Sequence, residues 1–209
     1  SYAVDPQKGA VVMTLTTQGD VPIHYTLDGS EPTAASPRYT GPVEIGKSAR
    51  FRATALREGG ENASYSREFA FSKSTGRPAV LNTKPNDSYT FEGASLLVDG
   101  YHSRPVFTSG AWLGYLDEPL DVTIDMGGEQ SYRSVELETL AEKGDWIFPP
   151  SSVTVWVSDN GTDFTEVASV AVPEAKAGDA DGIGRYRMQF PETSARYLKV
   201  VAQNAAAIP

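Results

Sequence analysis

Apolar and polar residues alternate along most of this chain in short runs that end at glycine, proline, asparagine or aspartate. Between residues 11 and 16, for example, Val11, Met13 and Leu15 fall on one side of an extended chain, and Thr14 and Thr16 fall on the other. Alternation of this kind is typical of half-buried β-strands. No stretch repeats apolar residues at helical spacing over three turns, so the pattern predicts an all-β protein with little helix.

The same pattern places the strands. We expect strands near residues 11–16, 23–25, 50–55 and 69–71 in the first part of the chain, and near residues 122–126, 135–137, 153–157, 186–190 and 195–201 in the second. Between Ser158 and Phe164, the sequence Asp159-Asn160-Gly161 predicts a tight β-hairpin, because Asn-Gly adopts the positive φ angles of such turns. Two β-sandwiches in tandem are the simplest architecture for these strands.

A polar stretch from Ser72 to Pro78 separates two parts of different charge. Residues 1–76 carry 8 basic and 8 acidic side chains, whereas residues 77–209 carry 10 and 19. We therefore predict two domains, 1–76 and 77–209, each long enough to bury a core. The net charge of −9 argues against nucleic acid or an anionic membrane as a partner, since both require basic residues that neutralise phosphates.

Composition excludes several kinds of chemistry. The chain has no cysteine, so it has no disulfides, thiolate zinc ligands or thiol nucleophiles. Its two histidines, His24 and His102, lie far from any Gly-x-Ser-x-Gly motif of the kind that presents a serine nucleophile. No apolar run reaches the roughly 18 residues that cross a bilayer, and residues 1–12 lack the pattern of a signal peptide. We expect no catalytic residue and no membrane insertion.

One motif is specific enough to suggest a family. Residues 23–33 read Ile-His-Tyr-Thr-Leu-Asp-Gly-Ser-Glu-Pro-Thr and are followed by Ser36, Tyr39, Pro42 and Val43. This run resembles the small β-sandwich module near the C-terminus of chitobiases and β-hexosaminidases. Its residues also make physical sense on their own, because Asp28-Gly29 provides a tight turn and Pro32 stops a strand. We interpret the motif as architectural rather than catalytic.

Scattered but ordered matches suggest a second family. Leu97-Val98-Asp99-Gly100, Ile124-Asp125-Met126-Gly127 and the run from Ser158 to Phe164 resemble the discoidin, or coagulation factor type C, sandwich, which also forms the family 32 carbohydrate-binding modules. The resemblance implies an immunoglobulin/fibronectin-like sandwich followed by a galactose-binding-like jelly-roll sandwich. This order of modules is similar to the C-terminal region of bacterial family 20 β-N-acetylhexosaminidases, usually placed outside the cytoplasm in the periplasm or at the cell surface.

The sequence departs from these families in two ways, and the first concerns catalytic activity. The enzyme family's catalytic (β/α)₈ barrel carries an adjacent Asp-Glu pair, and nothing in this chain alternates strand and helix as a barrel would. Asp117 and Glu118 are adjacent, but they precede Pro119 without the family's surrounding residues, so we expect a solvated loop. The second departure concerns the discoidin-like sandwich, which usually carries one more strand than the sequence up to Pro209 accounts for. We therefore expect the second domain to be truncated before its last strand.

Aromatic and polar residues in the loops of the second domain are candidates for sugar recognition, which needs an aromatic face and hydrogen-bonding groups. In the discoidin-like modules, the loops at one end of the sandwich carry the sugar site. The candidate ligand-binding residues are Tyr101, His102, Arg104, Trp112, Trp146 and Phe148. For Trp112 and Phe148, packing inside the domain is the favoured alternative, since large aromatic side chains are mostly buried.

Calcium is the metal that the residue types allow, because oxygen ligands are abundant and clusters of cysteine or histidine do not occur. The discoidin resemblance implies a site near the opening loop, with Asp99 as the carboxylate ligand. The sequence Asp179-Ala180-Asp181-Gly182 lacks the remaining ligands of an EF-hand and is expected to form an acidic loop.

Three functional interpretations remain open from the sequence. The leading one is a non-catalytic accessory region that binds glycan with a terminal galactose or N-acetylhexosamine, next to the catalytic barrel of a parent β-N-acetylhexosaminidase. A second is a pair of purely structural modules that pack on that barrel. The third and least favoured is independent enzymatic activity, because no activated nucleophile or spaced carboxylate pair can be recognised.

Overall fold

A computed structural model describes residues 1–57, 59–116, 118–176 and 178–205. The described residues form strands connected by loops and by short 3₁₀ turns, and the all-β prediction is confirmed. The chain divides into two compact units. The first contains Ser1–Arg77 together with Leu97–His102, and the second contains Pro78–Leu96 and Ser103–Pro209.

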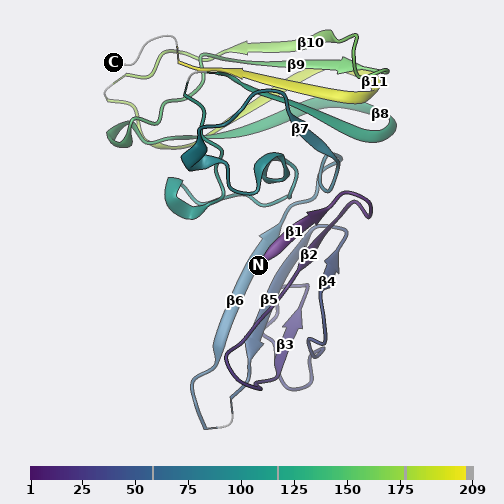
Figure 1. Ribbon diagram of the computed structural model, residues 1–209, viewed down its shortest axis with the longest axis vertical. Coiled ribbons are helices and arrows are strands. Elements are labelled where there is room, and N and C mark those ends of the chain that lie inside the picture. Colours follow the sequence, from purple (N-terminus) through teal and green to yellow (C-terminus); the bar gives the residue numbers. More distant parts are fainter. Residues whose placement is uncertain (58, 117, 177, 206–209) are drawn as a thin grey trace. The chain divides into compact units, whose positions relative to one another are not determined.

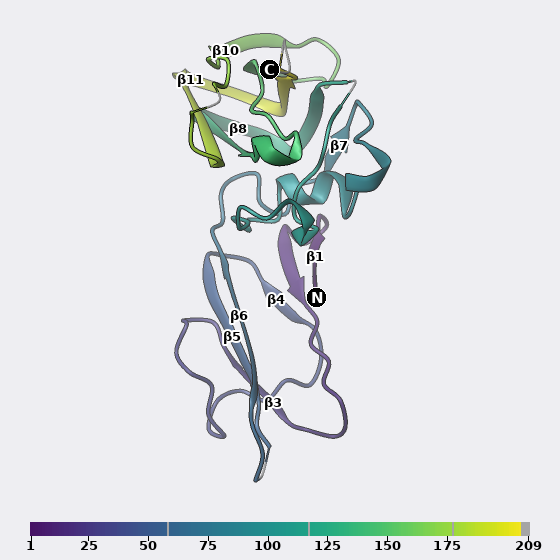
Figure 2. The same cartoon turned by 90° about the vertical axis from the view of Figure 1, so that its left-hand side faces the viewer.

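The first unit is a sandwich of two three-stranded antiparallel sheets. One sheet has the order β1 (Tyr2–Asp5), β2 (Ala10–Met13) and β4 (Val43–Ile45), and the other has the order β3 (Ile23–Thr26), β5 (Ala49–Ala55) and β6 (Ala63–Phe69). Figure 2 shows the two layers of this unit from the side, with β1 and β4 in one and β5 and β6 in the other. Their facing side chains form a core, made of Val11, Met13, Val43, Ile45, Phe51, Ala53 and Phe69.

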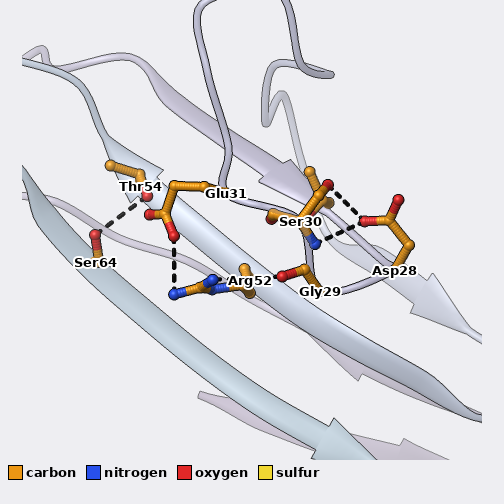
Figure 3. Close-up of polar contacts among 8 residues, drawn as sticks. Asp28, Gly29, Ser30, Glu31, Arg52, Thr54 and Ser64 are labelled. Carbon is orange, nitrogen blue, oxygen red and sulfur yellow. Dashed lines mark hydrogen bonds and ion pairs between the residues drawn. The ribbon is translucent and has the colours of Figure 1, made fainter.

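The loop after β3 is fixed by polar contacts from Asp28 to Glu31 (Figure 3). The carboxylate of Asp28 accepts hydrogen bonds from the backbone N–H and the hydroxyl of Ser30, at 2.9 and 2.6 Å. Arg52 on β5 pairs with Glu31 at 2.8 Å and donates to the carbonyl of Gly29 at 3.4 Å. Gly29 has a φ of +87°, which favours glycine. These contacts give the four motif residues from Asp28 to Glu31 a structural role.

The second unit is built on a five-stranded sheet with the order β10 (Thr165–Ala171), β9 (Ser152–Ser158), β11 (Gly182–Gln203), β8 (Leu120–Ala141) and β7 (Ala79–Leu81). The sequence predicts two separate strands where the structure has the single long strand β8, and two more where it has β11. These strands pair with each other from Ala202↔Leu120 to Gly182↔Ala141, with register shifts after Gln189 and Ala195 (Figure 1).

Alternating residues of this sheet form the core of the second unit. On β8 and β9 the buried positions follow the predicted period of two, and they include Val122, Ile124, Met126, Val153 and Val155. The predicted hairpin is confirmed, because β9 and β10 pair in antiparallel fashion on either side of residues 159–164. The turn is longer than a two-residue one, and of Asn160 and Gly161 only Gly161 has a positive φ, at +77°. The side-chain oxygen of Asn160 accepts bonds from the backbone N–H groups of Thr162 and Asp163, which closes the turn.

The segment Leu97–His102 lies within the first unit, although its chain neighbours on both sides belong to the second. The backbone N–H of Ala70 donates to the carbonyl of Gly100 at 2.7 Å, and that of Gly76 donates to Val98 at 2.8 Å. These bonds pair the segment with the residues that follow β6.

Among the residues that the structure describes, no helix is long and apolar enough to cross a membrane.

Candidate functional site

Trp146 is the most exposed of the large apolar side chains described, at 71%. It caps the C-terminal end of the 3₁₀ turn η4 (Lys143–Asp145), which lies in the loop between β8 and β9. The loop is closed by two backbone hydrogen bonds between Glu142 and Ile147, at 2.9 and 3.1 Å. These bonds fix the backbone from which the Trp146 side chain projects into solvent.

The backbone of Trp146 is left-handed, with a φ of +61°. For a residue with a Cβ atom this conformation costs roughly 1–2 kcal/mol. Its N–H donates to the carbonyl of Lys143 at 3.1 Å, which fixes the turn. A strained backbone beneath an exposed tryptophan contributes little to folding, and strain of this kind is concentrated at functional sites.

Phe148 contacts the indole of Trp146 edge to face, with ring centroids 6.5 Å apart and ring planes at 76°. Phe148 itself is half-buried. It therefore supports one side of the Trp146 ring while most of that ring stays in solvent. An open indole face offers the apolar surface on which the C–H groups of a sugar ring can stack. Trp146 and Phe148 are thus two predicted site residues that the fold brings into ring contact.

Arg104 and Trp112 form a second pair. The indole N–H of Trp112 donates to the backbone carbonyl of Arg104 at 3.0 Å, and the Trp112 side chain is half-buried. This bond uses the one polar group of Trp112 to hold the backbone of the neighbouring loop, while Arg104 is exposed. This hydrogen bond supports the alternative that Trp112 packs inside the domain. Ligand binding by Arg104 and Trp112 stays a prediction.

Tyr101 packs against the core of the first unit. Its ring lies under the guanidinium of Arg67, with the Arg67 Cζ atom 3.8 Å from the ring centroid, and it meets the Tyr2 ring at 6.2 Å in an edge arrangement. Two neighbouring side chains thus contact the Tyr101 ring, one of them over its face. The adjacent His102 is exposed. Sugar contact by Tyr101 and His102 stays a prediction.

Asp99 is buried, with 4% of its surface exposed. One carboxylate oxygen accepts a 2.6 Å hydrogen bond from the hydroxyl of Tyr2, and the other accepts a 2.8 Å bond from the backbone N–H of Tyr101. Burial raises the pKa of Asp99 above its ordinary value, against the lowering effect of these bonds and of Arg67. Burial also raises the pKa of Tyr2, so its hydroxyl stays protonated and remains a donor.

Both oxygens of Asp99 already accept hydrogen bonds from the protein, so a calcium ion would have to share or displace these donors. Within the described ranges of the chain, no group of three or more Asp, Glu, His or Cys side chains is placed to hold a metal ion. The groups that contact Asp99 are hydrogen-bond donors, which suit a carboxylate without a bound calcium ion better than one that coordinates it. The calcium site predicted from the sequence is untested, and these two hydrogen bonds argue against it.

The acidic residues of the loops have structural partners. The Glu118 carboxylate accepts a 3.0 Å bond from the backbone N–H of Lys84, and its neighbour Asp117 lies outside the described residues. Asp181, from the predicted acidic loop, pairs with Lys143 at 2.6 Å. Sequence reasoning missed the contributions of Tyr2, Arg67 and Lys143, because strand pairing and loop closure, rather than spacing along the chain, bring them to their partners.

Comparisons with known families divide the chain in two. Residues 6–67 match the family described as the chitobiase/beta-hexosaminidase C-terminal domain. Residues 82–208 match the family described as the F5/8 type C domain. A comparison with curated proteins found no matching relative.

Solved structures of similar proteins include carbohydrate-binding modules. Chitosan-binding module 1 of a chitosanase/glucanase from Paenibacillus sp. IK-5 is 18% identical, with 66% of this chain and 91% of that chain covered and a TM-score of 0.44. CpGH89CBM32-5 from Clostridium perfringens, in complex with GalNAc-β-1,3-galactose, is 17% identical, with 62% and 86% covered and a TM-score of 0.42. The C-terminal domain of a chitobiase from Bacteroides fragilis is 19% identical, with 62% and 83% covered and a TM-score of 0.38.

Proposed function

Because the chain belongs to the F5/8 type C domain family, we propose that it is a non-catalytic accessory region of a β-N-acetylhexosaminidase-like glycoside hydrolase. We propose further that glycan binds at residues 142–147, which we call the Trp146 loop. The match of residues 6–67 to the chitobiase/beta-hexosaminidase C-terminal domain supports this choice of parent enzyme. The ligand we propose is a glycan that ends in galactose or an N-acetylhexosamine. Such a parent works on glycans outside the cytoplasm, in the periplasm or at the cell surface.

The observation that carries the proposal is the exposed, left-handed Trp146 with Phe148 behind it. A residue that served only the fold would be expected to bury its ring and to adopt a relaxed backbone. Trp146 does neither. An aromatic face supported on a closed loop is instead what a sugar ring needs, because stacking on a fixed ring loses little side-chain entropy.

The proposed role in the parent enzyme is tethering. A module that holds one part of a glycan raises the effective concentration of neighbouring glycosidic bonds near the catalytic barrel. This increases turnover of long or insoluble substrates without any new chemistry in the module. The gain depends on geometry, so it vanishes when module and barrel cannot reach the same glycan.

An NMR titration of the 209-residue chain tests the proposal, with galactose, N-acetylgalactosamine, N-acetylglucosamine and chitobiose as ligands. We expect saturable shifts of the Trp146 indole N–H and of the surrounding loop. Trp146→Ala should raise the Kd at least tenfold. Phe91→Ala is the matched control, because Phe91 is also an exposed aromatic residue with positive φ, at 46% exposure and +35°, and it should leave the Kd unchanged.

The purely structural alternative makes the opposite prediction. If the modules only pack on the barrel, no sugar at millimolar concentration shifts the Trp146 resonances. A third outcome, in which shifts occur but persist in Trp146→Ala, would move the binding site to another loop.

A further inference from the structure

The Trp146 loop is tied to the loop that precedes β11. The ammonium of Lys143 donates to the carboxylate of Asp181 at 2.6 Å and to the backbone carbonyl of Asp179 at 2.8 Å. The backbone N–H of Lys143 donates to the same Asp181 oxygen at 3.1 Å. One residue of the Trp146 loop therefore makes three hydrogen bonds to the end of the other loop, and we call this arrangement the Lys143–Asp181 brace.

The brace connects directly to the tryptophan. The carbonyl of Lys143 accepts the N–H of Trp146, so the residue that Asp181 holds also fixes the turn from which the indole projects. On the other side, Asp181 precedes Gly182, which pairs with Ala141 at the end of β8. The first loop thus begins, and the second ends, at the paired residues Ala141 and Gly182. Lys143 lies two residues beyond Ala141, and Asp181 directly precedes Gly182.

The lysine of this ion pair is better shielded than the cation of an exposed surface pair. The Lys143 side chain is 15% exposed and that of Asp181 is 48% exposed. By comparison, Arg133 and Glu192 in the same unit pair at 2.7 Å with side chains that are 75% and 52% exposed. Water and salt screen a shielded ammonium less, and its two hydrogen bonds, to the Asp181 carboxylate and the Asp179 carbonyl, restrain the loop.

We propose that Lys143 and Asp181 are positioning residues that hold the Trp146 indole in an orientation in which a sugar ring can stack on it. This inference rests on the proposed glycan binding by the Trp146 loop. The two residues act through the loop backbone and not through contact with the ligand. Their effect is preorganisation, because a loop that is already ordered loses less conformational entropy when the ligand binds.

The test compares Asp181→Asn, Lys143→Met and the double variant with wild type in the full chain. Asp181→Asn keeps an acceptor of the same shape, and Lys143→Met keeps the apolar stem of the side chain. We expect each single variant to raise the sugar Kd about three- to tenfold and to lower the heteronuclear NOE of the Trp146 indole N–H. The double variant should bind no worse than Lys143→Met, since Asp181→Asn weakens a charge pair that Lys143→Met already removes and keeps an acceptor for the Lys143 backbone N–H.

Glu192→Gln is the matched control, because it breaks the exposed Arg133–Glu192 pair and should change neither the Kd nor the indole NOE. Unchanged indole NOE values and unchanged Kd in both single variants would overturn the brace. If wild type binds none of the four sugars, the proposed function fails, and the NOE comparison still decides whether Lys143 and Asp181 order Trp146. If Asp181→Asn does not fold, Lys143→Met tests the same bond.

Discussion

The hydroxyl of Tyr2 donates a 2.6 Å hydrogen bond to the carboxylate of Asp99, although the two residues are 97 positions apart in the sequence. The bond lies inside the first unit, where the segment that carries Asp99 packs beside the end of β6. Arg67 adds a positive charge, with its Cζ atom 4.5 Å from the Tyr2 ring centroid and 3.8 Å from that of Tyr101. A tyrosine, an arginine and a backbone N–H thus compensate one buried carboxylate.

Tyr2→Phe should destabilise the first unit by about 1–3 kcal/mol, because it leaves a buried carboxylate oxygen without its donor. Urea unfolding followed at the methyl resonance of Met13, which is fully buried in this unit, measures the effect. Tyr65→Phe is the control, since Tyr65 is 37% exposed and its hydroxyl group should contribute less than about 0.5 kcal/mol. Equal effects of the two substitutions would show that the Tyr2 hydroxyl contributes nothing specific.

The pH dependence of stability should carry the signature of Asp99. Because burial raises the pKa of Asp99 in the folded state above 3.8, the folded protein holds this proton more tightly than the unfolded chain does. The resulting stabilisation is fully present below the unfolded pKa and is lost as pH rises through the folded pKa. Wild type should therefore lose stability relative to Asp99→Asn across this window, and unfolding measured from about pH 3 to about pH 7 checks it. A constant difference over that range would contradict it.

Calcium distinguishes two roles for Asp99. A ligand role predicts that the ion raises the melting temperature of wild type but not of Asp99→Ala. A hydrogen-bonding role predicts equal melting temperatures in calcium and in chelator. We expect the second result at about 10 mM calcium, well above the Kd of about 0.1–1 mM at extracellular sites, because both Asp99 oxygens already accept bonds. A saturable rise that Asp99→Ala abolishes would establish the ligand role.

The fold was predictable from the sequence wherever short-range pattern determines structure. Alternation predicts the buried faces of β2, β5 and β9, and Asn160-Gly161 predicts the hairpin, because side-chain period and turn chemistry are local properties. The continuity of β8 and β11 was not predictable. Each contains polar or glycine positions, such as Gly127-Gly128 and Pro191-Glu192, that look like chain breaks. These positions fall at the two register shifts, and the pairing of β8 with β11 resumes on either side of them.

The candidate site was predictable only in part, for a related reason. An aromatic residue in a glycine- and proline-bounded loop marks Trp146, and its exposure and left-handed backbone follow from a turn that the sequence indicates only loosely. The contacts that surround Tyr101 and Asp99 depend on packing across the first unit. No spacing along the chain encodes them.

Gly29→Ala should destabilise the first unit by about 1–2 kcal/mol without changing sugar binding. Gly29 has a φ of +87°, and a Cβ atom there would lie 3.0 Å from the Cβ of Arg50. Gly46→Ala is the control, because an added Cβ meets nothing within 4 Å. Urea unfolding at the Met13 methyl resonance should show the loss for Gly29 alone. Equal stability of the two variants would mean that the loop in Figure 3 relaxes at little cost.

Trp146→Asn should separate stability from binding. Asparagine tolerates the left-handed backbone, so this substitution relieves strain of about 1 kcal/mol, while the lost edge contact with Phe148 costs about 0.5–1.5 kcal/mol. The free energy of unfolding should therefore change by less than about 1 kcal/mol, whereas the sugar Kd should rise at least tenfold. Urea unfolding followed at the methyl resonance of Met126, which is buried in the second unit, measures the first quantity, and NMR titration measures the second.

Two comparisons make this prediction specific. Trp146→Ala removes the same ring but keeps the strained backbone, so it should be less stable than Trp146→Asn and bind sugar equally poorly. Phe91→Asn makes the same exchange at the other non-glycine residue that we describe with positive φ, and it should leave the sugar Kd unchanged. A large loss of stability in Trp146→Asn would instead assign the indole to the fold, because removing a tryptophan from a packed core costs about 3–5 kcal/mol. Retained binding in that variant would remove Trp146 from the proposed site.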